Sequence, residues 1–296
     1  MLEYHSGAKL ADLAAAAGKN ISDLVLEDQA GQLEKSADHV FEKMRKHFLV
    51  MRTACEKGFA AGLVSPSGLS GGQAARMQAK VRKGPSPNDA SLAGSFCAGA
   101  IARALAVSEY NAAMGRIVAA PTAGSCGILP AALLTMIEEK GVSERAAVMS
   151  LFTAGALGLV IAGEASISGA EGGCQAECGS AAAMATAALV ELAGGSPPAV
   201  LHAAAIALKN QLGLVCDPVA GLVEVPCVKR NAGAVMCAIG AAEMALAGIE
   251  SVIPFDEVVS AMAEIGAAMP RSLKETAQAG LAATPTGAAI QQKLFG

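Results

Sequence analysis

The sequence is poor in aromatic and charged residues. Only 3% of its 296 residues are aromatic, none is Trp and 16% are charged, whereas 53% are hydrophobic. This balance excludes a disordered chain and allows a sizeable buried core. Aromatic residues favour strands, and small residues let helices approach closely, so the 33 glycines and the many alanines predict a tightly packed helical protein.

The chain also lacks an excess of positive charge. Its formal charge is −4, and no long run of Lys and Arg occurs, so neither a nucleic-acid partner nor a membrane partner is expected. The longest apolar stretch, 146–162, contains Ser150 and Thr153 and lies between Arg145 and Glu164. It predicts a buried central helix. The first residues show no signal-peptide pattern, and we expect a cytoplasmic protein.

Strand-like alternation and internal repeats are missing as well. The pattern predicts an all-α fold: a single compact helical domain over 1–296 with Gly- and Pro-rich loops between its helices. We expect 1–19 to be an N-terminal extension and 284–296 a weakly structured tail. Catalytic groups are often carried on loops of this kind. The loops are 65–72, 84–88, 121–127, 169–173 and 216–226.

Helix starts are marked by capping residues. Asn20 and Ser143 are each followed by an acidic residue in the first turn, and Ser196 precedes Pro197. Short polar side chains favour the N-cap, and Pro favours the first helical position. Helices are therefore predicted to begin at these points, and another is predicted to begin at Asn231.

The eight cysteines include no Cys-x-x-Cys pair, and a cytoplasmic setting argues against disulfides. Cys55, Cys97 and Cys237 lie inside apolar helical patterns and are predicted to be small buried hydrophobic residues. The other five lie in or beside the loops, where a thiolate can be stabilised and can reach a metal. They are Cys126, Cys174, Cys178, Cys216 and Cys227.

Spacing alone leaves the number of metal ligands open. Cys174 and Cys178 would face the same way on a helix and, with Cys216 and Cys227, could make a closed zinc or electron-transfer site. Three ligands would instead leave an iron exposed for Lewis-acid chemistry. Buried thiols without any metal are the third possibility.

Several other chemistries find little support. None of the four histidines lies in a loop, which argues against a Ser–His–Asp hydrolase. Segments 67–72 and 122–127 could bind an anion at a helix N-terminus or could simply connect helices, and neither matches a nucleotide-binding motif. Lys80 is a weak candidate for a pyridoxal-phosphate lysine.

Taken together and in order, the loop segments resemble the iron–sulfur L-serine dehydratase family. They read SPSGLSGG from Ser65, PTAGSCGILP from Pro121, EGGCQAE from Glu171, CDPVAGLVEVPCVKRN from Cys216, and LKET followed by GLA from Leu273. The resemblance runs from about residue 20 to the end and is most specific between Cys216 and Asn231. It implies a helical catalytic region.

The resemblance implies a 4Fe–4S cluster held by Cys174, Cys216 and Cys227, with Cys178 as a bystander. One iron would stay open to substrate, and no pyridoxal phosphate would be used. The implied activity is that of an L-serine ammonia-lyase, which eliminates water from L-serine and releases pyruvate and ammonia in amino-acid catabolism and gluconeogenesis.

Polar groups of the loops would then orient the substrate. Our candidates are the side chains of Ser70, Thr122, Ser125 and Asn231 and the backbone amides of Gly71 and Gly124. Lys229 or Arg230 could attract the substrate carboxylate, but at most one should face it, since adjacent residues on an extended chain point apart. The sequence identifies no general base.

Single-chain members of that family carry a further domain with a Ser-Ser-His-Thr motif, which is missing from this sequence. The chain thus resembles the alpha chain of two-chain members, and this implies a beta-chain partner and an oligomer. Three alternatives stay open: a cysteine desulfidase-type lyase with a similar cluster, a pyridoxal-phosphate dehydratase, and a non-enzymatic protein with a closed iron–sulfur or purely structural site.

Overall fold

The computed structural model describes residues 2, 5–82 and 91–296. The described residues are 71% helical and contain no β-strand, which confirms the all-α prediction. Two isolated bridges, Val64 with Gly71 and Cys216 with Lys274, are the extended pairings found among them. The predicted loop 84–88 lies outside the described residues.

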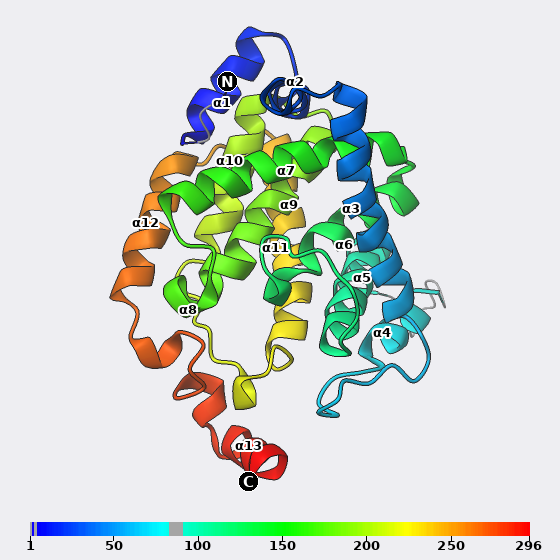
Figure 1. Ribbon diagram of the computed structural model, residues 1–296, viewed down its shortest axis with the longest axis vertical. Coiled ribbons are helices and arrows are strands. Elements are labelled where there is room, and N and C mark those ends of the chain that lie inside the picture. Colours follow the sequence, from blue (N-terminus) through cyan, green and yellow to red (C-terminus); the bar gives the residue numbers. More distant parts are fainter. Residues whose placement is uncertain (1, 3–4, 83–90) are drawn as a thin grey trace.

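Helix α9 (Ser180–Leu192) runs through the centre of the molecule (Figure 1). Every residue from Ser180 to Val190 is buried, and most of them are alanine. Side chains this small allow close packing, and α9 contacts four other helices. They are α6 (Ile128–Lys140), α7 (Glu144–Glu164), α10 (Pro197–Lys209) and α11 (Cys227–Leu246).

The other helices surround this centre. α3 and α4 pack against α5, α2 packs against α7 and α3, and α1 packs against α10 and α12. Among the described residues, the bounds of these helices are α1 (Gly7–Ala16), α2 (Ile21–Leu33), α3 (Ala37–Gly58), α4 (Gln73–Arg82), α5 (Gly94–Ala112) and α12 (Phe255–Ala268). The C-terminal α13 (Pro285–Phe295) lies at the opposite end from α1 and α2, and the short α8 (Gly169–Gly172) lies between them along the long axis (Figure 1).

Helix α7 is long and apolar enough to cross a membrane by length and composition alone. In the structure 61% of its most apolar window is buried, and it packs against α9, α2 and α3. The stretch 146–162 is thus a central helix within the described chain, as its sequence predicted.

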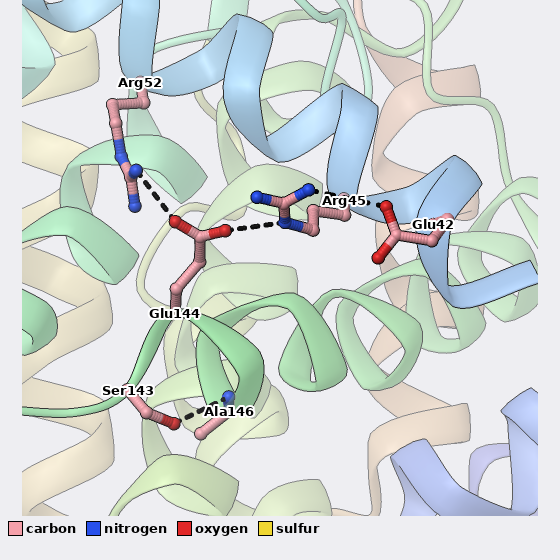
Figure 2. Close-up of polar contacts among 6 residues, drawn as sticks. All are labelled: Glu42, Arg45, Arg52, Ser143, Glu144 and Ala146. Atoms are coloured by element: carbon pink, nitrogen blue, oxygen red, sulfur yellow. Dashed lines mark hydrogen bonds and ion pairs between the residues drawn. The ribbon is translucent and has the colours of Figure 1, made fainter. Parts of the chain in front are cut away.

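The N-terminus of α7 is tied to α3 by charge. Glu144 accepts from Arg45 Nε at 2.7 Å and lies 2.8 Å from Arg52 Nη1, while Ser143 caps the helix by accepting from Ala146 N at 3.1 Å (Figure 2). The hydrogen bonds to these arginines lower the pKa of Glu144. An acidic residue also suits the positive end of a helix dipole.

Capping residues marked most helix starts correctly, since Ser143 and Ser196 cap α7 and α10 through their side chains. Asn20 holds the N-cap position of α2 without a side-chain bond. The helix predicted to begin at Asn231 instead begins at Cys227. Residues 227–231 are therefore helical, not extended.

The described parts of both terminal segments contain a helix. The expected weak tail is α13, whose N-cap Thr284 accepts from Gly287 N at 3.1 Å. Local capping by Thr284 followed by Pro285 was the signal for this helix. The expected extension contains α1, whose Leu10 and Ala14 are buried in the main core. Asp256 of α12 accepts from Gly7 N at 2.7 Å and fixes this helix.

Candidate active site

The segment after Pro121 folds into a short helical turn, η1 (Ala123–Ser125), just before α6. Thr122 and Ser125 cap each other, since Thr122 N donates to Ser125 Oγ at 3.4 Å and their hydroxyls lie 3.2 Å apart. Ser125 is fully buried. The predicted substrate-binding residues Thr122, Gly124 and Ser125 therefore form one rigid turn.

Asn231 locks this turn to α11. Its Nδ2 donates to Gly124 O at 2.7 Å and to Cys227 O at 3.0 Å, while its Oδ1 accepts from Gly127 N at 2.8 Å. The side chain is 1% exposed. Burial of a polar amide is tolerable because these bonds satisfy it. Direct contact of Asn231 with a substrate stays a prediction.

The three cysteines of the predicted metal site lie on three separate segments. Cys174 precedes a π-helical turn, η2 (Gln175–Gly179), Cys216 forms a bridge with Lys274, and Cys227 is the first residue of α11. π-turns are rare and frequently lie at functional sites. Cys174 and Cys216 are buried and Cys227 is half-buried.

The fully buried Gln175 fixes the position of Cys174. Its backbone N–H donates to Leu214 O at 2.9 Å, its Oε1 accepts from Gly213 N at 2.9 Å, and its Nε2 donates to Met262 O at 3.0 Å. One side chain thus joins η2 to the segment that leads into Cys216 and to α12.

The cysteines lie within each other's electrostatic field. Burial raises the pKa of Cys227 to about 12 and also raises the pKa of Cys216, and the charge of Cys174 adds to both shifts. The pKa of Cys174 is lowered by its contact with Cys178 and by Arg230. The direct sulfur contacts among the described residues are Cys174 Sγ to Cys178 Sγ at 3.5 Å and Cys216 Sγ to Glu177 Oε2 at 3.9 Å. Binding of one cluster by Cys174, Cys216 and Cys227 stays a prediction.

Cys178 is fully buried, and its Sγ lies 3.5 Å from Cys174 Sγ. This contact and burial raise the pKa of Cys178 well above its usual value. The role of Cys178 as a bystander that does not bind metal stays a prediction.

Glu177 was not among the residues predicted from the sequence. It accepts from Thr122 Oγ1 at 2.7 Å, and Cys216 Sγ lies 3.9 Å from its Oε2. Burial raises the pKa of this carboxyl. Gly124 and Gly169 leave room for it, since a Cβ on either would lie 3.1 Å or less from a Glu177 oxygen. Glu177 belongs to the EGGCQAE segment, but nothing local distinguishes it from Glu171.

Arg230 turns away from solvent toward the cysteine loop. Its Nη2 donates to Asp217 Oδ1 and its Nη1 to Val215 O, both at 2.8 Å. Its neighbour Lys229 is exposed. This arrangement agrees with the expectation that at most one of Lys229 and Arg230 faces the site. The two side chains point apart because both residues lie in helix α11, and not because the chain is extended there.

The segment 65–72 and the residues that follow it are held by two buried glutamates. Ser67 Oγ donates to Glu224 Oε1 at 2.6 Å, and Glu109 of α5 accepts from Gln73 N and Ala74 N at 3.0 Å each. Ser70 is 3% exposed, and its Oγ has no hydrogen-bond partner among the described residues. No described hydrogen bond joins Ser70 or Gly71 to the Thr122 turn, so their role stays a prediction.

A cavity of about 570 Å³ opens where these loops meet. Ser67, Asn111, Ala123 and Glu224 contribute to its wall, and Phe295 of α13 closes one side. Asn111 Nδ2 donates to Ala123 O at 3.3 Å and so holds the wall to the Thr122 turn. The wall of this cavity includes none of the three predicted cysteine ligands and not Glu177.

The remaining candidates lie elsewhere. Cys55 and Cys126 are buried core thiols whose pKa burial raises to about 12, whereas Cys97 and Cys237 are only half-buried. Lys80 is exposed on α4, unlike a Schiff-base lysine in a dry pocket. No three His, Cys, Asp or Glu side chains among the described residues converge as ligands of a single ion.

Comparison with known proteins places the chain in a family. The family model described as "Serine dehydratase alpha chain" matches residues 16–282. The chain belongs to the serine dehydratase alpha-chain family. All the residues described above from Thr122 to Asn231 lie inside the matched range.

Relatives within the serine dehydratase family are similar over most of the chain. The probable L-serine dehydratase alpha chain of Bacillus subtilis is 52% identical over 93% of this chain and 90% of the relative. The L-serine dehydratase alpha chain of Peptoniphilus asaccharolyticus is 43% identical over 97% of each. The L-serine dehydratase of Streptomyces coelicolor is 42% identical over 94% of this chain but only 60% of that protein.

Proposed function

We propose that this chain is the catalytic subunit of an iron–sulfur L-serine dehydratase, which converts L-serine to pyruvate and ammonia without pyridoxal phosphate. The observation that carries the proposal is that Glu177, three residues after Cys174, contacts both Thr122 and Cys216. The substrate assignment rests on relatives whose names identify them as L-serine dehydratases.

The donor set suits a multi-iron cluster better than a single ion. The cysteines of a cubic cluster each bind a different iron, so their sulfurs need not converge on one point. Three thiols serve a four-iron cluster with one iron left free of protein ligands. Thiols must lose their protons to bind metal, and Arg230 favours the thiolate of Cys174.

Such a cluster, when bound, would supply a Lewis-acid iron that stabilises the departing hydroxide of serine. The protein's own residues would do the rest. The Thr122 turn, held by the hydrogen bonds of Asn231, would contribute the side chains of Thr122 and Ser125 and the backbone of Gly124 to substrate binding. Ser70 and Gly71 would orient the substrate from the other loop.

Glu177 is the group we assign to hold or move a proton, at Oε2. Its Oε1 is already engaged by Thr122, and this bond fixes the direction of Oε2 toward Cys216. A carboxylate placed beside the reacting atoms can accept the Cα proton that serine must lose. The sequence alone left this role without a candidate.

The proposed enzyme also includes a second chain. The Streptomyces relative has about 40% of its length outside the match, since the match covers 60% of it. We propose that a separate beta chain supplies the corresponding part, in a cytoplasmic oligomer.

The test is an anaerobic reconstitution of the chain with iron and sulfide, followed by L-serine with and without the candidate beta chain. We expect pyruvate formation that requires iron and is indifferent to added pyridoxal phosphate. Pyruvate that appears only with the beta chain would place a missing group there. L-cysteine, tested in parallel, distinguishes desulfidation.

Two results would overturn the proposal. Pyruvate formation by an iron-free chain would remove the cluster from the reaction. An intact cluster that turns over cysteine but not serine, with or without the beta chain, would replace L-serine as the substrate.

A further inference from the structure

Cys216 is held on both sides by the C-terminal part of the chain. Its backbone N–H donates to Leu273 O at 2.8 Å, and its C=O accepts from Glu275 N at 2.8 Å. These two bonds form a parallel bridge between Cys216 and Lys274, one of two isolated bridges in the described residues. The bridge spans 58 positions of sequence, so it depends on where the C-terminal segment lies.

The next residue, Asp217, makes a second connection to the same segment. Its Oδ2 accepts from Leu281 N at 2.7 Å, and its Oδ1 accepts from Arg230 Nη2 at 2.8 Å. Its side chain is 4% exposed. Each oxygen of this buried carboxylate therefore has a strong donor, one from α11 and one from the C-terminal segment.

The backbone of the C-terminal segment is shaped to make these contacts. Glu275 and Ala277 have positive φ angles of 61° and 55°, which residues other than glycine rarely adopt. Gly280 has a φ of 62°, and a Cβ there would lie 2.4 Å from Asp217 Oδ2. Strained conformations persist where surrounding structure holds them, often at functional sites.

The remainder of the segment covers the same loop. Beyond Thr284, α13 packs on η3 (Val219–Gly221), the turn between Cys216 and Cys227. The segment Arg271–Phe295, here named the C-terminal strap, thus contacts Cys216, Asp217 and the turn that follows them.

We propose that the C-terminal strap positions Cys216 for cluster binding, and that Asp217 is the positioning residue through which it acts. Asp217 couples the strap to Arg230 of α11, which also donates to Val215 O next to Cys216, so the strap sets the placement of Cys216 relative to α11. The role in cluster binding rests on the proposed function. The placement of Cys216 by the strap does not.

Alkylation of individual thiols in the iron-free, full-length chain tests this placement directly. Gly280→Ala forces the strap away from Asp217, and the rate of alkylation by iodoacetamide is followed for each cysteine by mass spectrometry. We expect Cys216 to react about tenfold faster or more, since one lost buried contact costs about 1–3 kcal/mol. Cys55, buried in α3, should react at its original rate.

Two comparisons distinguish a specific effect on the position of Cys216 from a general loss of protein stability. Gly248→Ala is the matched control, because Gly248 has a φ of 82° but a Cβ placed on it would meet nothing within 4 Å. It should leave Cys216 protected. A general loss of stability would raise alkylation at Cys55 and Cys216 together, whereas the strap acts on Cys216 alone.

Asp217→Asn is the second variant, for the case in which Gly280→Ala does not fold. It keeps the size of the side chain but leaves one of the two donors without an acceptor, and it should also expose Cys216. After reconstitution, both variants should hold less iron than the wild type, as measured by cluster absorbance. Protection of Cys216 at the wild-type level in the folded variants would overturn the proposal, whether or not the chain binds a cluster.

Discussion

Thr122 donates a hydrogen bond from Oγ1 to Glu177 Oε1 at 2.7 Å, across 55 positions of sequence. This contact joins the rigid turn before α6 to the π-turn that follows Cys174 and contains Cys178. Its consequence is that the predicted substrate loop and the predicted metal-binding segment form one unit. A substitution of Thr122 or of Glu177 should therefore alter both segments.

Glu177→Gln should reduce turnover of L-serine by about 100-fold or more, the usual contribution of a general base. Gln can still accept from Thr122, so the fold and the cluster absorbance should persist. Thr122→Val removes the hydrogen bond to Glu177 and the hydroxyl contact with Ser125, and it should cost about 0.5–1.5 kcal/mol of stability per lost bond with a smaller loss of turnover. Unchanged kcat in Glu177→Gln would exclude the assigned proton-transfer role.

The number of cluster ligands can be counted by substitution. Cys227→Ala should lose the iron-derived absorbance after reconstitution, because it removes one of three ligands. Cys178→Ser should keep this absorbance, since the buried Cys178 thiol supports Cys174 and does not bind iron in our proposal. Loss of the cluster in Cys178→Ser would indicate four ligands and a closed site.

Glu109→Gln should destabilise the protein by about 1–3 kcal/mol in urea unfolding. Glu109 is 1% exposed and accepts from the first backbone N–H groups of α4, so an amide would place an N–H group against another N–H. The matched control is Glu139→Gln on α6, where the side chain is exposed and stability should hardly change. Equal stability of the two variants would contradict the capping role.

Burial raises the pKa of Glu191, so this carboxyl carries a pH dependence of stability. The folded state keeps the proton to higher pH than the unfolded state does. Stability contributed by the protonated form is present below the ordinary value of 4.5 and is lost as the pH rises through the raised pKa. Thr153 Oγ1 donates to Glu191 at 2.6 Å, which limits the shift but does not reverse it.

Glu191→Gln should therefore gain stability relative to the wild type as the pH rises above 4.5, and the difference should level off once the wild-type carboxyl is ionised. Urea unfolding at a series of pH values measures it. Glu264→Gln, at an exposed position of α12, serves as the control and should parallel the wild type. A pH-independent difference for Glu191→Gln would show that its protonation is not linked to folding.

Much of the fold could be predicted from short stretches of the sequence. The caps Ser143 and Ser196 act within three residues of themselves, and the alanine-rich stretches need only small side chains to become central helices. The loops that carry the family's motifs were likewise visible, because Gly and Pro break helices wherever they stand. The helix after Thr284 had a local signal as well, the cap at Thr284 followed by Pro285.

The sequence by itself determined the helical class, the positions of the loops and the cysteines available to a cluster. Only the tertiary structure decided that Glu177 meets Thr122, that Asn231 ties Gly124 to α11, and that Asp217 meets Leu281. These contacts join residues 55, 107 and 64 positions apart. Periodicity and capping act over a few residues, whereas contacts at such separations exist only after the helices have packed and brought the loops together.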